Sequence, residues 1–115
     1  MFDFEKFEVY MKSKVFLKEV TSFVESNKHL SNRIADQLYR AALSIPLNIA
    51  ERAGRYSKPD KRNFYTVARG SVFECTAIID ILHEGGVLSK EQKDNYYNNL
   101  EELSKMLSGL INSLR

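Results

Sequence analysis

The sequence predicts an all-α protein, an antiparallel up-down-up-down four-helix bundle. Apolar residues recur every three or four positions in four successive segments, which is the spacing of one face of an α-helix. Only a few residues separate these segments, and short connections force sequential helices to lie antiparallel. The 115 residues are 43% hydrophobic and 28% charged, so a single domain over residues 1–115 can bury a core of its own.

The first predicted helix spans about residues 4–27, and its apolar face is unusually wide. One stripe holds Val9, Phe16, Val20 and Phe23. A stripe about 100° wide is enough to cover one core. Further apolar side chains lie beyond it, at Phe2, Phe4, Phe7, Met11 and Val15. We therefore expect a second buried contact on this helix, such as a subunit interface.

The second predicted helix begins after Ser31 and ends near Gly54. The Ser31 hydroxyl can accept a hydrogen bond from the free N–H groups of the first turn. Pro46 lies inside the helix, where it removes one backbone donor and crowds the preceding turn. Because the apolar spacing continues in phase after Pro46, the pattern favours one kinked helix. Its apolar positions are Ile34, Leu38, Ala41, Ala42, Ile45 and Ile49.

The third predicted helix begins after Ser57 and ends at Gly85 and Gly86. Ser57 with Asp60 three residues later resembles a capping box, and glycine permits the left-handed turn that ends many helices. Its apolar stripe comprises Phe64, Ala68, Ser71, Cys75, Ile78 and Leu82. The fourth predicted helix begins after Ser89, with Gln92 completing a second box. Its stripe comprises Tyr96, Leu100, Leu103, Leu107, Leu110 and Leu114.

Gly70 stands in the middle of the third predicted helix. Glycine there costs about 1 kcal/mol relative to alanine, so its presence calls for a compensating contact. Close approach of a neighbouring helix, at Ala41 or Ala42, would supply that contact. We therefore expect Gly70 to face the second helix.

Positive charge is concentrated in the middle of the chain. Residues 31–74 carry eight Lys and Arg side chains and four acidic ones, whereas the whole chain has a net charge of +2. This imbalance is compatible with an anionic partner, but it is well short of the heavily basic surface of an obvious nucleic-acid-binding protein. The nucleic-acid-binding candidates lie between the second and third helices, at Arg52, Arg55, Lys58, Lys61 and Arg62.

These five basic residues form two groups according to the helix dipoles. Arg52 and Arg55 complement the negative pole at the end of the second helix, which is a sufficient structural reason for them. Lys58, Lys61 and Arg62 open the third helix, where the positive pole disfavours cations. Their partners are then acidic residues of the same chain or another subunit, or phosphate groups. Rings that could stack on bases lie nearby, at Tyr56, Phe64 and Tyr65.

A polar row follows the second helix beside its apolar stripe. Its members are Arg40, Ser44, Asn48, Glu51 and Arg55. One interpretation is a Glu51–Arg55 pair one turn apart with solvated neighbours. A second is a hydrogen-bond network across helices or subunits that adds Arg69 and Glu74. A third is a ligand site. Of these three, we favour the network or subunit interface.

No residue pattern indicates catalysis, a metal or a cofactor. His29 and His83 have no Cys or second His at ligand spacing, and no Gly-rich phosphate loop is present. Cys75 lies on an apolar helical stripe, where a small thiol packs well. No apolar run approaches the length of a membrane helix or signal peptide. We therefore expect a non-enzymatic, cytoplasmic protein without metal or cofactor.

The chain resembles the four-helix-bundle family of bacterial ribosomal-RNA intervening-sequence proteins in two segments, QLYRAALSIPLNIAERAGR and KRNFYTVARGSVFE. It departs from that family's pattern at Leu47, where a small polar residue is frequent, and at Arg52, where glycine is usual. The resemblance implies a ring-like homopentamer without an established enzymatic activity. Related accessory variability proteins of retroelements engage nucleic acid and a reverse transcriptase through a basic surface.

Two functional hypotheses are compatible with these observations. In the leading one, a homo-oligomeric bundle, pentameric by resemblance, acts as a scaffold and presents Lys58, Lys61 and Arg62 to RNA or DNA. In the rival one, the protein is a protein–protein adaptor without a nucleic-acid role. The basic turn then meets acidic residues of a partner or of the adjacent subunit.

Overall fold

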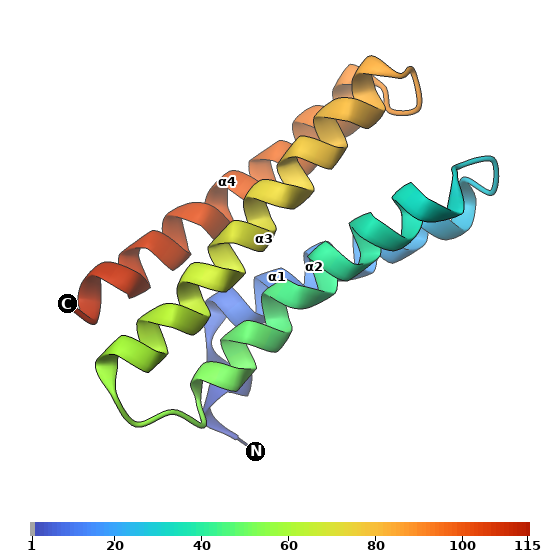
Figure 1. Ribbon diagram of the computed structural model, residues 1–115. Coiled ribbons are helices and arrows are strands. Elements are labelled where there is room, and N and C mark those ends of the chain that lie inside the picture. Colours follow the sequence, from blue (N-terminus) through green and yellow to red (C-terminus); the bar gives the residue numbers. More distant parts are fainter. Residues whose placement is uncertain (1) are drawn as a thin grey trace.

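The computed structural model describes residues 2–115, apart from the side chain of Lys6, and contains four long helices (Figure 1). A short 3-10 helix, η1 (Asp3–Lys6), precedes α1 (Glu8–Ser26). The other helices are α2 (Asn32–Arg52), α3 (Lys58–Glu84) and α4 (Lys90–Ser113). No strand occurs among the described residues. The prediction of an all-α fold with four helices is confirmed.

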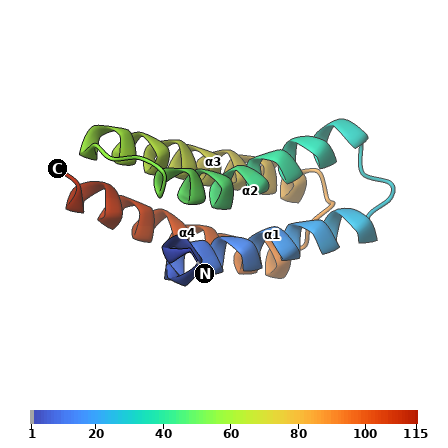
Figure 2. The same cartoon turned by 90° about the horizontal axis from the view of Figure 1, so that it is seen from below.

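The helices form an antiparallel bundle in two layers. Figure 2 shows α2 and α3 in one layer and α1 and α4 in the other. Each helix contacts its two neighbours around the bundle, while the diagonal pairs make no such contact. The bundle extends 44 Å along its longest axis. Within residues 2–115, no helix combines the length and the hydropathy that a bilayer crossing requires.

Both termini and the α2–α3 turn lie at one end of the bundle, and the other two loops lie at the opposite end (Figures 1 and 2). This placement follows from up-down-up-down topology, because each short loop reverses the chain direction. The α2–α3 turn therefore has the beginning of α1 and the end of α4 as its neighbours.

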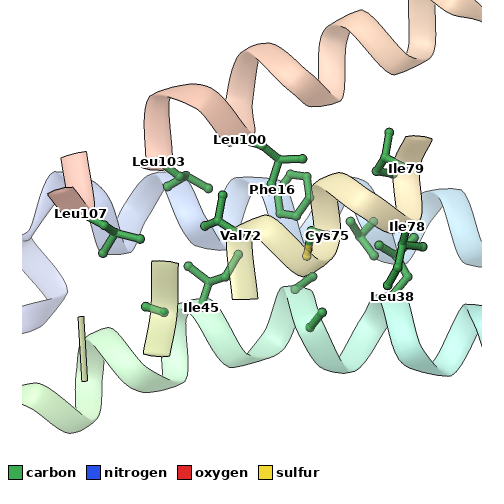
Figure 3. Close-up of a cluster of buried hydrophobic side chains, with 14 of the residues drawn as sticks. Phe16, Leu38, Ile45, Val72, Cys75, Ile78, Ile79, Leu100, Leu103 and Leu107 are labelled. Carbon is green, nitrogen blue, oxygen red and sulfur yellow. The ribbon is translucent and has the colours of Figure 1, made fainter. Parts of the chain in front are cut away.

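The core fills the space between the layers, and Figure 3 shows its central part. Apolar side chains from all four helices meet there, including Phe16, Leu38, Ile45, Val72 and Leu103. The predicted stripes identify most of the core but omit Tyr65, Val72, Ile79 and Ile111, which are buried. On α3 the omission has a physical reason. Because α3 packs against α2 on one side and α4 on the other, its buried face is wider than one stripe.

The amino-terminal segment differs from its prediction. A single helix was expected over residues 4–27, but Phe7 is extended at φ −69° and ψ 128° and separates η1 from α1. Aromatic contacts hold this segment: the Phe2 and Phe4 rings stack, and Phe4 meets Tyr10 edge to face at 5.1 Å. Of the apolar residues expected to make a second contact, Phe2, Met11 and Val15 are exposed.

The predicted starts of α2, α3 and α4 are confirmed, and each uses a serine. The Ser31, Ser57 and Ser89 hydroxyls accept from the backbone N–H groups of Arg33, Asp60 and Gln92. At Ser89 the box is reciprocal, because the Gln92 side chain accepts from the Ser89 N–H at 2.9 Å. Each cap satisfies donors that a helix start otherwise leaves free.

Pro46 does not interrupt α2, which is helical from Asn32 to Arg52. The proline ring is buried on the core side, next to the fully buried Ile45. Hydrophobic burial thus offsets the missing backbone hydrogen bond. The continuity of the helix, which the unbroken apolar pattern indicated, is confirmed. The kink expected at Pro46 stays a prediction.

The prediction for Gly70 is wrong. Gly70 is exposed, and a Cβ atom built on it would meet nothing within 4 Å. Its neighbour Ser71 makes the contact with α2 instead, donating to the Ser44 hydroxyl at 2.8 Å. A helical residue one position along is rotated by about 100°, so Gly70 faces away from α2.

Two glycines allow a matched test of backbone conformation. We expect Gly70→Ala to raise the free energy of unfolding by about 1 kcal/mol, because alanine favours the helix and has room. We expect Gly86→Ala to lower it by about 1–2 kcal/mol, because Gly86 has a φ of 80°. Urea denaturation followed by circular dichroism measures both. Shifts of the same sign in the two variants would contradict this account.

Candidate nucleic-acid interface

The turn between α2 and α3 covers residues 53–57 and carries the predicted basic candidates on both sides. Arg52 ends α2, and Arg55 lies within the turn. Lys58, Lys61 and Arg62 occupy the first turns of α3. Although these five residues are close in sequence, the structure gives them very different surroundings.

Arg52 is folded against the bundle. Its guanidinium carbon lies 5.4 Å from the centre of the Phe7 ring and 5.4 Å from that of Tyr65. Cation–π attraction to two rings holds it there. Burial raises the pKa of Tyr65, and the adjacent Arg52 charge partly offsets that rise. Arg52 is therefore directed toward η1 and α3 rather than toward solvent at the turn.

Arg55 and Arg62 also have partners inside the protomer. The Arg55 Nη2 atom donates to Glu51 Oε1 at 2.9 Å, and its guanidinium lies 4.6 Å from the centre of the Phe64 ring. Arg62 Nη1 donates to the backbone carbonyl of Leu114 at 2.6 Å. A cation at the end of α4 complements the negative pole of that helix. The structure thus supplies the reason for Arg62 that the sequence lacked.

Lys58 and Lys61 are the two candidates that remain. Neither ammonium group forms an ion pair among the described residues. Lys58 is exposed and Lys61 is half-buried. Both lie at the positive pole of α3, where Asp60 is the acidic residue of the first turn. An external anion at this position would relieve the repulsion.

Of the three rings proposed for base stacking, one is available. Tyr56 is 98% exposed, while Tyr65 is 1% exposed and belongs to the core. The Phe64 ring is half-buried and covered by the Arg55 guanidinium. Proteins that bind single strands combine exposed aromatic rings with basic side chains, and Tyr56, Lys58 and Lys61 supply both within six residues of the chain.

The predicted polar row separates into local contacts within the protomer. Arg40 Nε pairs with Asp36 at 2.8 Å on the exposed face of α2. Asn48 Nδ2 donates to the Ser44 carbonyl and hydroxyl oxygens at 2.8 and 2.9 Å. The Ser71 hydroxyl of α3 donates to the same Ser44 hydroxyl, so this contact joins α2 and α3. The contact across helices therefore runs through two serines and Asn48.

Arg69 lies apart from that row. Its Nη1 atom donates to the Ser108 hydroxyl of α4 at 3.2 Å, so Arg69 faces α4 rather than α2. Glu51 pairs with Arg55, and Glu74 is exposed. Arg40, Asn48, Glu51 and Arg69 do not form one network within a protomer. Their role at a subunit interface stays a prediction.

The structure gives no support to a catalytic thiol or a metal centre. Burial, with a smaller contribution from Glu74, raises the pKa of Cys75 to about 12, so the thiol is neutral and shielded. His83 Nδ1 donates to the Leu88 carbonyl at 3.0 Å, a contact that fastens the α3–α4 loop. No group of three potential metal ligands comes together within residues 2–115.

Comparison with known proteins identifies the family. The model of the 23S rRNA-intervening sequence protein family matches residues 5–109. The chain belongs to this family. A crystal structure with the same fold is that of a protein with unknown function from the S23 ribosomal protein family of Bacteroides thetaiotaomicron. Its TM-score is 0.83 at 24% identity, over 90% of this chain and 97% of that one. No curated protein matches the chain.

The motif residues that resemble the family mainly build the bundle. Ile45 and Ile49 are core residues, Ser44 and Ser71 join α2 to α3, and Ser57 caps α3. Membership of the 23S rRNA-intervening sequence protein family therefore accounts for the fold. It assigns no activity to the α2–α3 turn.

Replacing Arg62 tests whether it acts inside the protomer. We expect Arg62→Met to lower the free energy of unfolding by about 1–2 kcal/mol, because it removes a charged donor from the end of α4. The matched change Lys58→Met should stay within about 0.5 kcal/mol of the parent, because Lys58 is exposed. Urea denaturation provides the comparison. Equal effects of the two changes would show that the Arg62 contact does not stabilise the fold.

Proposed function

We propose that the protein is a non-enzymatic, homo-oligomeric scaffold, pentameric in its assembled form, that contacts RNA or DNA through the α2–α3 turn. One observation carries the nucleic-acid part. The 98% exposed Tyr56 ring lies in the turn that leads into Lys58 and Lys61, and neither lysine has an ion-pair partner in the described part of the protomer. Stacking on Tyr56 would hold a base while the lysines bind phosphate oxygens.

The exposed apolar residues support assembly. In the α2–α3 layer they are Tyr39, Leu47, Val67, Phe73 and Ile81, each between 39% and 59% exposed. Gly70 lies on the same outward side of α3 and would let another helix approach closely. Exposed apolar side chains gathered along neighbouring helices are typical of a surface that a protein partner covers.

A second exposed apolar group lies in the other layer of the bundle. Phe2, Met11 and Val15 belong to the η1–α1 side, which Figure 2 shows opposite α2 and α3. A closed ring with more than two copies needs two different surfaces on each subunit. Two apolar groups in opposite layers meet this requirement, which is why we favour a ring over a two-fold dimer.

The rival proposal is a protein–protein adaptor, in which another protein covers one of these apolar groups. The exposed Phe73 and Ile81 on α3 favour it as much as they favour assembly. In that case the two lysines of the turn bind acidic residues of the partner. Nucleic-acid binding separates the two proposals.

Binding to single-stranded RNA and DNA should depend on salt and on the two lysines. We expect Lys58→Glu with Lys61→Glu to abolish binding in fluorescence anisotropy at low salt, because repulsion replaces two phosphate contacts. In the parent, a plot of log affinity against log salt concentration should be linear, with a slope of about −0.7 for each phosphate contact. Tyr56→Ala should weaken binding roughly 5- to 150-fold through lost stacking.

A matched control changes the charge equally on α1 and the α1–α2 loop, away from the α2–α3 turn. Lys18→Glu with Lys28→Glu involves two exposed lysines and should leave nucleic-acid binding within about twofold. If this control loses as much affinity as the turn variant, general charge explains the binding and the turn does not. If the parent binds neither RNA nor DNA at low salt, the adaptor proposal replaces this one.

Light scattering on the purified protein tests assembly. We expect a mass of five times 13.3 kDa at micromolar concentration. Phe73→Glu with Ile81→Glu should lower that mass to the protomer value, because charges cannot be buried without partners in a subunit contact. Circular dichroism checks that the helices are retained. A parent protein that stays monomeric would show that the exposed apolar groups do not drive self-assembly.

A further inference from the structure

A cavity of about 520 Å³ opens near the end of the bundle that carries the α2–α3 turn. Phe7, Tyr65, Met106 and Leu110 supply most of its walls, so it is largely apolar. Arg52 also lines it. Its volume lies in the range of roughly 300–1,000 Å³ that is common for small-molecule sites.

The Arg52 guanidinium has no carboxylate partner in this cavity. Its Nε atom is buried and has no hydrogen-bond partner, and no described carboxylate pairs with Arg52. The centres of the Phe7 and Tyr65 rings each lie 5.4 Å from the guanidinium carbon. The Nε–H group is left without an acceptor, and no carboxylate neutralises the Arg52 charge. A buried donor without an acceptor destabilises a protein, so the contacts to the two rings account for only part of this arrangement.

Glu8 is the acidic residue at the cavity, and it does not neutralise Arg52. Its side chain is 72% exposed, and its carboxylate lies 3.9 Å from Lys12 Nζ. The cavity therefore presents the charge of the half-buried Arg52 at one place and apolar walls elsewhere.

We propose that this cavity binds a small amphipathic carboxylate, such as a medium-chain fatty acid. The carboxylate accepts hydrogen bonds from the Arg52 guanidinium, whose planar fork matches its two oxygens. The alkyl chain lies against Met106 and Leu110, where its removal from water favours binding. This site is separate from the nucleic-acid contact of Tyr56, Lys58 and Lys61, and it requires neither that contact nor the oligomer.

Another cavity of similar size, between α1 and α4, lacks this combination. Its lining includes Lys18, Glu19 and several uncharged polar residues, and Glu19 accepts from Asn99. No buried cation without a partner lines it. The Arg52 cavity is thus the better candidate for an anion with an apolar chain.

Decanoate is a suitable probe, used below its micelle concentration with the full-length ¹⁵N-labelled protein. We expect saturable NMR shift changes confined to residues around the cavity, together with a shift of the Arg52 Nε–H signal as the guanidinium binds the carboxylate. Decyltrimethylammonium has the same chain length and the opposite charge, and should bind at least about tenfold more weakly.

Two substitutions and one control test the assignment. Arg52→Met keeps an apolar side chain but removes the donors, and should weaken decanoate binding about 10- to 100-fold. Gly109→Leu should abolish binding by filling the cavity, since Gly109 lines it and a Cβ there meets nothing within 4 Å. The helix tolerates leucine well. The matched control Arg33→Met alters an exposed arginine at the far end of α2 and should leave binding unchanged.

Several results would overturn the proposal. Equal affinity for the anion and the cation would show that Arg52 takes no part, and shift changes without saturation would show that no site exists. Unchanged decanoate binding by Gly109→Leu would place the probe elsewhere. If Gly109→Leu instead changes the mass in light scattering while decanoate still binds, the cavity is a contact between copies of the chain.

Discussion

The close contact between α2 and α3 is the constraint on which the rest of the bundle depends. A serine side chain is short, so the 2.8 Å hydrogen bond between the Ser71 and Ser44 hydroxyls requires the two helices to lie close together. The fully buried Ala42 and Ala68 allow this approach. With these helices paired, the five residues between them must form a tight turn at the bundle end. That turn projects Tyr56 into solvent.

Most of the fold could be predicted from the sequence because the decisive signals are local. Serine caps and the three-four spacing act within one or two turns of helix, and both gave correct starts for α2, α3 and α4. Which way a single side chain points depends on neighbouring helices that are remote in sequence. Gly70 was therefore assigned to the wrong side of α3, and Phe7, whose ring packs on Arg52, was not recognised as a helix break.

The candidate site could be predicted less well, for the same reason. Arg62 binds the Leu114 carbonyl, which is 52 residues away in sequence, and Arg52 lies between rings from η1–α1 and α3. No local sequence pattern predicts contacts between residues so far apart in the chain. Dipole arguments correctly allowed for a structural role of Arg52 and Arg55, but they grouped Arg62 with the lysines. The structure leaves Tyr56, Lys58 and Lys61 as the part of the turn without a role inside the protomer.

A turn with so few basic residues can serve a nucleic-acid scaffold only if several copies of it act together in an oligomer. One protomer has a net charge of +2 and offers two lysines and one ring, which is too few contacts for tight binding. In the proposed ring, however, cyclic symmetry places every α2–α3 turn at the same end, because each turn lies at one end of its bundle. A strand bound to one turn then meets the next at a high effective concentration. In this proposal, assembly and nucleic-acid binding are parts of one mechanism.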